Sequence, residues 1–262
     1  MKVKDIIKEM EKLAPPFLKE SYDNVGLMVG DEEKDVQKIL LALDCTKEVI
    51  NEAILNNIDL IITHHPLIFR KPSRIVMGDL QGEKIISLIK NDISLYSSHT
   101  NLDTVKGGIN ETIVKMLGFG ESKIIDEVEN PEYKGSGIGR IVKLSQEKTP
   151  QDIIDLVKNK LNVENLRVVI GDKPISKIAI INGSGQDYFS DAVRYGADCI
   201  ITGDTTYHYA SDYKEMGITI IDPGHFKTEW IIFLEVMKNI ESKFTNIEFM
   251  HSRVSNDPYE FF

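Results

Sequence analysis

The stretch Leu60-Ile61-Ile62-Thr63-His64-His65-Pro66 decides the predicted fold. Three consecutive apolar residues predict a buried strand, and the strand must end at Pro66 because proline has no N–H to donate to a neighbouring strand. His64 and His65 therefore stand at the carboxyl end of a strand, where open α/β sheets place their functional sites. By itself, the pair fits one buried structural imidazole beside one exposed imidazole as well as it fits metal ligation.

The chain repeats this segment once. Residues 38–40 and 59–63 match residues 177–179 and 198–202 at a constant offset of 139, without a gap. At this offset His64 and His65 correspond to Gly203 and Asp204. The repeat predicts an α/β fold of two related modules from an internal duplication, with a metal site at the strand carboxyl ends between them. A chance match of composition is the alternative, and the polar residues at both strand ends argue against it.

A polar segment marks the expected seam between the two modules. Residues 120–137 are mostly polar and include Pro131, Gly135 and Gly137, which are typical of loops. We expect a first α/β module at residues 1–125 and a second at residues 126–229. Residues 230–262 are expected to form a helix and a strand that pack back on the first module.

Composition excludes several classes of function. The 262 residues are 42% hydrophobic and 27% charged, which is typical of a soluble globular protein. The net charge of −10 argues against nucleic acid as the main partner. The two cysteines, Cys45 and Cys199, form neither a metal-binding spacing nor a disulfide framework, which fits a reducing, cytoplasmic compartment. No signal peptide is evident, and no apolar run reaches the roughly 18 residues that a membrane span needs.

Side chains that bind metals follow several of the predicted strands. His99-x-x-x-Asp103 follows the strand at 93–97, and His225-x-x-x-Glu229 follows the strand at 218–221. Residues four apart share a helix face, so each spacing alone also fits an ordinary helix surface or a cap. Combined with the repeat, the metal interpretation is favoured. The candidate ligands are His64, His65, Asp103, His225 and Glu229.

This set of donors indicates the kind of metal centre. Imidazole nitrogens and carboxylate oxygens without a thiolate suit a catalytic zinc, manganese or iron ion. Five ligands exceed what one tetrahedral ion with an open position requires. Two divalent ions at the ~3.5–4 Å spacing of dinuclear hydrolases, with one shared carboxylate, would use all five.

Other polar residues near these loops have roles that the sequence leaves open. His99 and His208 are candidate general acids or bases. Asp204 and His208 fit partners that orient imidazoles or a proton-transfer pair, and His208 fits equally well a residue carried along by the packing of neighbouring tyrosines. A basic segment fits either a receptor for a substrate anion or a solvated loop. Its residues are Arg70, Lys71 and Arg74. Asp44 and Thr46 are candidate caps for the helix that follows them.

Five motifs in the chain resemble those of a known family, the GTP cyclohydrolase 1 type 2 homologues, also called NGG-interacting-factor-like proteins. They occur in the family's order and span nearly the whole chain: Tyr22-Asp23-Asn24-Val25-Gly26-Leu27, Thr63-His64-His65-Pro66, Ser98-His99-Thr100-Asn101-Leu102-Asp103, Gly203-Asp204-x-x-Tyr207-His208 and Asp222-x-Gly224-His225-x-x-x-Glu229. The resemblance implies two related α/β domains in a toroidal homohexamer, with the metal sites facing the interior. It also implies that Glu229 bridges two metal ions.

Two functions from different classes follow from these observations. The first is a dinuclear metal-dependent hydrolase that acts on a nucleotide-like or other small polar substrate through a metal-bound water. The second is a non-catalytic metal-binding scaffold, or a metal-handling or regulatory protein. The sequence has no G-x-x-x-x-G-K-[ST] phosphate loop, so no cofactor-binding residue other than the metal ligands is predicted.

Overall fold

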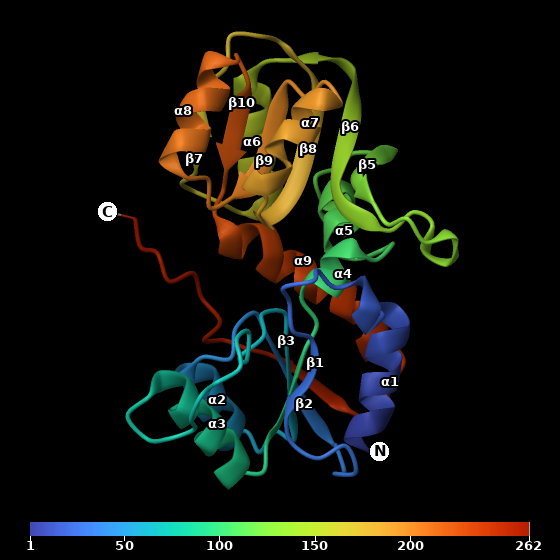
Figure 1. Ribbon diagram of the computed structural model, residues 1–262, viewed down its shortest axis with the longest axis vertical. Coiled ribbons are helices and arrows are strands. Elements are labelled where there is room, and N and C mark those ends of the chain that lie inside the picture. Colours follow the sequence, from blue (N-terminus) through green and yellow to red (C-terminus); the bar gives the residue numbers. More distant parts are fainter. Residues whose placement is uncertain (262) are drawn as a thin grey trace. The chain divides into compact units, whose positions relative to one another are not determined.

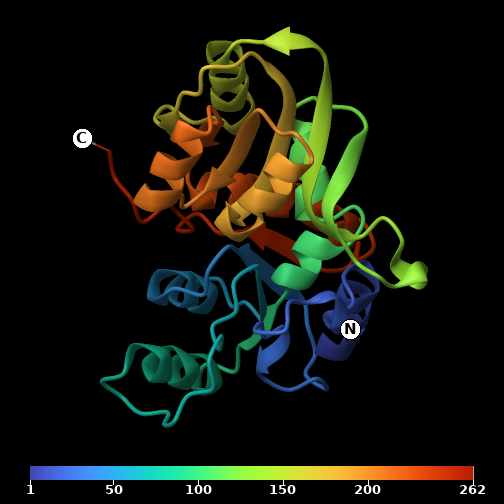
Figure 2. The same ribbon diagram turned by 45° about the horizontal axis from the view of Figure 1, so that its top comes forward.

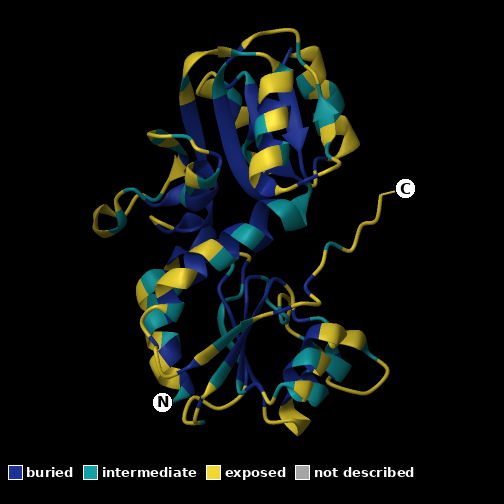
Figure 3. Cartoon of the chain, turned by 180° about the vertical axis from the view of Figure 1, so that it is seen from behind, coloured by how far each residue is buried: buried dark blue, intermediate teal, exposed yellow. Residues whose placement is uncertain are grey.

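The computed structural model describes residues 1–261 and divides into two compact units. The first unit contains residues 1–105 and 233–256, and the second contains residues 106–232 together with the chain from residue 257 onward. Helix α9 (His225–Glu241) therefore begins in the second unit and ends in the first. In both units the strands are largely buried, whereas the outward faces of the helices are exposed (Figure 3).

A five-stranded sheet forms the centre of the first unit. Its strands, in spatial order, are β1 (Gly26–Val29), β4 (Ser94–Ser97), β3 (Leu60–Thr63), β2 (Lys38–Ala42) and β11 (Glu248–His251). All are parallel except β1, which pairs with β4 in the antiparallel sense. Helices cover both faces of the sheet, two on one face and, on the other, one helix together with the end of α9 (Figure 1). These are α2 (Lys47–Leu55) and α3 (Leu80–Lys90), and on the opposite face α1 (Val3–Leu13).

Strand β3 explains why the histidines stand where they do. Every residue of β3 is buried, because helices cover both faces of this parallel sheet and both faces must be apolar. The ladder continues one step beyond the strand, where the N–H of His65 donates to the carbonyl of Leu43 at 2.9 Å. Pro66 cannot extend it. The predicted buried strand is confirmed, and it ends directly before His64.

A six-stranded sheet forms the centre of the second unit. Its strands, in spatial order, are β5 (Ser122–Glu127), β6 (Gly137–Lys148), β8 (Ile175–Ser184), β9 (Cys199–Gly203), β10 (Thr219–Asp222) and β7 (Arg167–Val169). The central strands β8, β9 and β10 are parallel, and the remaining pairs are antiparallel. Strand β6 is long and curved beside β5 (Figure 2). Helices α7 (Phe189–Arg194) and α8 (Tyr207–Glu215) cover one face, and α6 (Pro150–Leu161) lies on the other (Figure 1).

The two units contain the same β–α–β–α–β arrangement, namely β2-α2-β3-α3-β4 and β8-α7-β9-α8-β10. Ile39 pairs with Leu60 in the first sheet. Ile178 pairs with Cys199 in the second, so the register of the first two strands repeats at the offset of 139. The predicted α/β fold of two related modules is confirmed at this level, and an internal duplication accounts for it.

The turn before the middle strand repeats as well. The carboxylate of Asp59 accepts the backbone N–H groups of Gln37 and Lys38 at 2.8 and 3.0 Å. At the same offset, the carboxylate of Asp198 accepts the N–H groups of residues 176 and 177 at 2.9 and 3.0 Å. Each aspartate thereby fixes the start of two adjacent strands.

The two histidine motifs are shifted by one residue against this register. Ser94 and Thr219 hold the same position in the third strands, since each pairs with the first residue of the middle strand. That pair is 125 residues apart, whereas His99 and His225 are 126 residues apart. The backbone equivalent of His99 is therefore Gly224. The two motifs match in chemical pattern at a strand end, not residue for residue.

The unit boundaries differ from those expected of the modules. Residues 106–125 lie in the second unit, because β5 pairs with β6 and because α5 (Ile109–Met116) packs on β6 and β8. The polar segment 120–137 is thus largely the β5–β6 hairpin rather than a seam. At the other end, residues 233–256 belong to the first unit, whereas the chain from residue 257 belongs to the second.

Among residues 1–261, no helix is both long enough and apolar enough to cross a bilayer.

Candidate metal centre

Three histidines meet at the carboxyl ends of β3 and β4 in the first unit. His64 and His65 follow β3, and His99 follows β4, the neighbouring parallel strand. The ring centroids of His64 lie 5.2 Å from those of His65 and His99, and the latter two are 5.5 Å apart. One ring nitrogen from each of the three lies within 4.8 Å of the others. We call these three residues the histidine cluster; its nitrogens are close enough to hold a metal ion.

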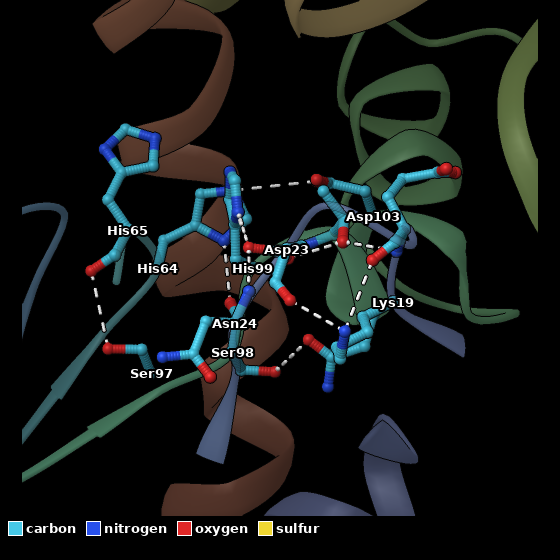
Figure 4. Close-up of polar contacts among 12 residues, drawn as sticks. Lys19, Asp23, Asn24, His64, His65, Ser97, Ser98, His99 and Asp103 are labelled. Carbon is cyan, nitrogen blue, oxygen red and sulfur yellow. Dashed lines mark hydrogen bonds and ion pairs between the residues drawn. The ribbon is translucent and has the colours of Figure 1, made fainter. Parts of the chain in front are cut away.

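Each ring of the histidine cluster is held through Nδ1, and Figure 4 shows this for His64 and His99. The Nδ1 of His64 is 2.9 Å from the carbonyl oxygen of Ser98. The Nδ1 of His65 is 2.9 Å from Asp44 Oδ1, and that of His99 is 2.9 Å from Asp23 Oδ1. Carbonyl and carboxylate oxygens only accept hydrogen bonds, so each Nδ1 is the donor. The fixed tautomer assigns the role of ligand or base to Nε2, the arrangement that metal-binding histidines usually show.

A buried carboxylate stands beside the cluster. Asp103 lies on α4 (Thr100–Thr104), is 7% exposed, and places Oδ1 3.6 Å from His64 Nε2. This distance is too long for a hydrogen bond. It matches the separation of two ligands on one ion, since bonds of about 2.0–2.2 Å in tetrahedral geometry leave donor atoms roughly 3.5 Å apart. His64 is fully buried, so the nitrogen and the carboxylate face each other away from bulk water.

Asp23 is the functional residue that sequence reasoning missed. It lies in the first of the five motifs, where the sequence assigns it no role. In the structure its carboxylate fixes His99, accepts the backbone N–H of Thr100 at 3.1 Å and accepts the hydroxyl of Thr100. Burial raises the pKa of Asp23, but the hydrogen bonds and charge of His99 and the bonds from Thr100 outweigh it and lower that pKa to about 2. Asp23 is therefore ionised at neutral pH. The only sequence feature that could have pointed to this role is the polar pair Asp23-Asn24 before β1.

Two predicted ligands lie together in the second unit. His225 begins α9, Glu229 follows one turn later, and His225 Nε2 lies 2.9 Å from Glu229 Oε2. The Nδ1 of His225 is 2.8 Å from Asp204 Oδ2, so this imidazole too is held by a carboxylate. Glu229 is 3% exposed, and its Oε1 accepts the side-chain N–H of Asn182 at 3.0 Å. We call His225 and Glu229 the α9 pair.

His208 lies apart from these contacts. It is exposed in the first turn of α8 and contacts the ring of Tyr207 at a centroid distance of 5.5 Å. Within residues 1–261, no hydrogen bond joins His208 to Asp204, so the predicted proton-transfer pair is not formed. Of the two roles weighed for Asp204, orientation of an imidazole is the one the structure shows. The basic residues Arg70, Lys71 and Arg74 are exposed in the loop after β3.

The cysteines take no part in either group. Cys45 and Cys199 are free, buried thiols in the cores of the two units. Burial raises the pKa of the Cys45 thiol to about 12 and raises that of Cys199 as well. Neither residue is therefore a thiolate at neutral pH. The nitrogen and oxygen donors described above suit zinc, iron or manganese.

Comparison with known proteins gives one consistent result. The family model described as Duf34/NIF3 (NGG1p interacting factor 3) matches residues 1–258. A relative from Clostridium perfringens, named GTP cyclohydrolase 1 type 2 homolog, is 56% identical over the full length of both chains. A relative of the same name from Clostridium acetobutylicum is 50% identical and covers 100% of this chain and 99% of its own.

Solved structures agree with this result. A Bacillus cereus protein related to NIF3 superimposes with a TM-score of 0.91 at 26% identity, covering 100% of this chain and 99% of its own. Reduced HcgD from Methanocaldococcus jannaschii superimposes with a TM-score of 0.82 at 29% identity, covering 96% of this chain and 97% of its own.

Proposed function

This chain belongs to the Duf34/NIF3 family, and on that premise we propose that it is a metal-dependent hydrolase acting on a nucleotide-like or other small polar substrate. The observation that carries the proposal is the histidine cluster, in which three imidazoles present Nε2 and each Nδ1 is held by an oxygen. Preorganised imidazoles of this kind lower the free energy needed to assemble a metal site and the base beside it.

We further propose that the chain binds two divalent ions through His64, His65, Asp103, His225 and Glu229, with Glu229 as the bridge. The donor chemistry within each unit and the family membership support this assignment. When bound, such ions lower the pKa of a coordinated water toward neutrality and polarise the group under attack.

His99 is assigned the proton-transfer role in this proposal. The five ligands are sufficient for two ions, which leaves Nε2 of His99 to take a proton from, or return one to, the reacting groups. Asp23 holds the ring in the required tautomer and stabilises the imidazolium that proton uptake produces. The same support distinguishes His99 from His208, which is exposed and has no such carboxylate partner among residues 1–261.

A screen of phosphoester, amide and purine-nucleotide substrates tests the proposal. Wild-type protein is reconstituted with zinc, manganese or iron, and product release and bound metal are both measured. We expect His65→Ala to lose metal and turnover together, and His99→Gln to retain metal and lose turnover. A folded, metal-loaded protein that hydrolyses none of these classes supports the non-catalytic scaffold instead. Unchanged turnover in His65→Ala would overturn the metal-dependent mechanism.

Assembly and location complete the proposal. By family membership we propose a homohexamer in the cytoplasm, where the free thiols Cys45 and Cys199 stay reduced. Each chain has a mass of 29.6 kDa, so light scattering at micromolar concentration is expected to give about six times that mass. A value near that of one chain contradicts the assembly.

A further inference from the structure

Two exposed aromatic rings lie next to the histidine cluster. Tyr22 is 65% exposed and Phe69 is 41% exposed, and their ring centroids are 6.3 Å apart with the planes tilted by 59°. The ring of Phe69 also meets the edge or face of His99 at a centroid distance of 6.3 Å and an interplanar angle of 76°. We call Tyr22 and Phe69 the aromatic pair. Phe69 contacts His99, the proposed proton-transfer group, and Tyr22 contacts Phe69.

Hydrogen bonds hold the two loops that carry the aromatic pair. The side-chain amide of Asn24 donates to the carbonyl of Ile68 at 2.6 Å, which joins the residue two positions after Tyr22 to the residue directly before Phe69. Asp23 ties the first loop to His99. Gln81 donates to the carbonyl of Leu67 at 2.8 Å and ties the second loop to α3. Much of the conformational entropy of a binding surface is therefore lost on folding and need not be lost again on binding.

The charge of the loop that carries Phe69 suits a phosphorylated ligand. Phe69 is followed by Arg70 and Lys71, with Arg74 in the same loop, and all three cations are exposed. No acidic residue occurs between positions 64 and 78. In a chain with a net charge of −10, this loop is a local surplus of positive charge that directly follows Phe69, the ring in contact with His99.

We propose that Tyr22 and Phe69 form a stacking platform for the planar heteroaromatic ring of a phosphorylated small molecule. Ring faces stack on any planar base, whatever its hydrogen-bonding groups. The loop cations receive the phosphate, and a ring on the platform places its substituents toward His99. The placement of reacting atoms rests on the proposed hydrolase function, whereas the binding itself does not.

Paired probes test the platform without any turnover. Guanosine 5′-monophosphate and ribose 5-phosphate share a phosphate and a sugar, and differ by the base. Calorimetric titration of the full-length chain, stripped of metal with a chelator, measures both affinities. We expect wild-type protein to bind the nucleotide about tenfold more tightly or better, the usual effect of stacking one base.

Variants assign that difference to the two rings. The double variant Tyr22→Ala/Phe69→Ala is expected to bind both probes equally, while Tyr22→Phe keeps the preference and Arg70→Ser weakens both probes alike. Tyr195→Ala is the matched control, because Tyr195 is an exposed tyrosine of the second unit. Circular dichroism checks folding. Equal binding of the two probes by wild type, or an unchanged preference in the double variant, overturns the platform even if hydrolysis is found. A preference that needs the rings supports it even if hydrolysis is absent.

Discussion

In the first unit, β3 delivers His64 and His65 at its carboxyl end, whereas in the second unit β9 delivers Gly203 and Asp204 at the same two positions. In the first unit the strand supplies the imidazole of His65, and Asp44 supplies the carboxylate that holds it. In the second the strand supplies the carboxylate of Asp204, and the helix start supplies the imidazole of His225.

The two units thus exchange the positions of the imidazole and the carboxylate, and the reason is steric. A Cβ atom on Gly203 would lie 2.8 Å from the backbone N and Cα of His225. Gly183, which corresponds to Asp44 at the offset of 139, would place a Cβ 2.3 Å from Glu229 Oε1. The space that side chains fill at the strand ends of the first unit is filled in the second by the start of α9. One scaffold thus carries the same carboxylate–imidazole pair by two routes.

The largest expected effect is a difference in bound metal between a carboxylate variant of the second unit and one of the first. If Glu229 bridges two ions, Glu229→Ala should bind well under one metal per chain, while Asp103→Ala should retain close to one. The bridge also offsets the repulsion between two dications a few ångströms apart. Elemental analysis after gel filtration gives the counts, and circular dichroism checks that both variants fold. Two ions retained by folded Glu229→Ala rule out the bridge.

The steric reason for the exchange can be tested at Gly203. Gly203→Ala is expected to lower the free energy of unfolding by about 1–3 kcal/mol, because the added methyl group meets backbone atoms that cannot turn aside. Urea denaturation measures the change. Gly120→Ala is the control, since nothing lies within 4 Å of a Cβ there, and it should change stability by less than about 0.5 kcal/mol. Equal effects at the two positions contradict the steric explanation.

His99 is held by Asp23, a carboxylate from outside the repeat. The contribution of Asp23 to the free energy of unfolding can be identified by its dependence on pH. The pKa of Asp23 falls from an ordinary value of 3.8 to about 2, so its contribution is present above pH 3.8 and is lost as the pH drops toward 2. The loss amounts to about 2 kcal/mol. Urea denaturation of chelator-treated protein between pH 5 and pH 2 should show a shallower acid loss for Asp23→Asn than for wild type. Parallel curves would contradict the assignment.

The smallest expected effect concerns what the two units share. Asp59 and Asp198 each accept two backbone N–H groups at equivalent turns, so Asp59→Ala and Asp198→Ala should each destabilise the protein by about 1 kcal/mol. Asp198 also accepts the hydroxyl of Ser176 at 2.7 Å, and its loss should be slightly the larger. Thermal unfolding compares the two. An effect in only one of them would break the equivalence of the turns.

Much of the fold could be predicted from the sequence, because buried parallel strands are short apolar runs and the repeat gives their register. The two compact units divide at residue 105 and not near residue 125, because β5 pairs with β6, and pairing partners leave little trace in composition. Thr46 caps α2 as expected, since its hydroxyl accepts the N–H of Val49 at 3.1 Å. Asp44, the other candidate cap, instead holds His65.

In the candidate site, too, some residues could be predicted from the sequence and others could not. Residues directly after strands could be singled out because their positions follow from the strands themselves. Their supporting partners could not: Asp23 lies 76 residues from His99, and Asp44 lies 21 residues from His65. Only the folded chain brings such pairs together. The five proposed ligands stay a prediction, which the metal counts will test.

The close approach of Gly203 to His225 also limits how this chain can change over evolutionary time. Suppose that both halves of an ancestral repeat once carried a histidine at this strand end. After the start of α9 had packed against β9, any side chain larger than hydrogen at position 203 would meet its backbone. Return to histidine would then require simultaneous displacement of the helix that carries His225 and Glu229. The asymmetry between the halves would then be difficult to reverse, even where selection on the metal centre is weak.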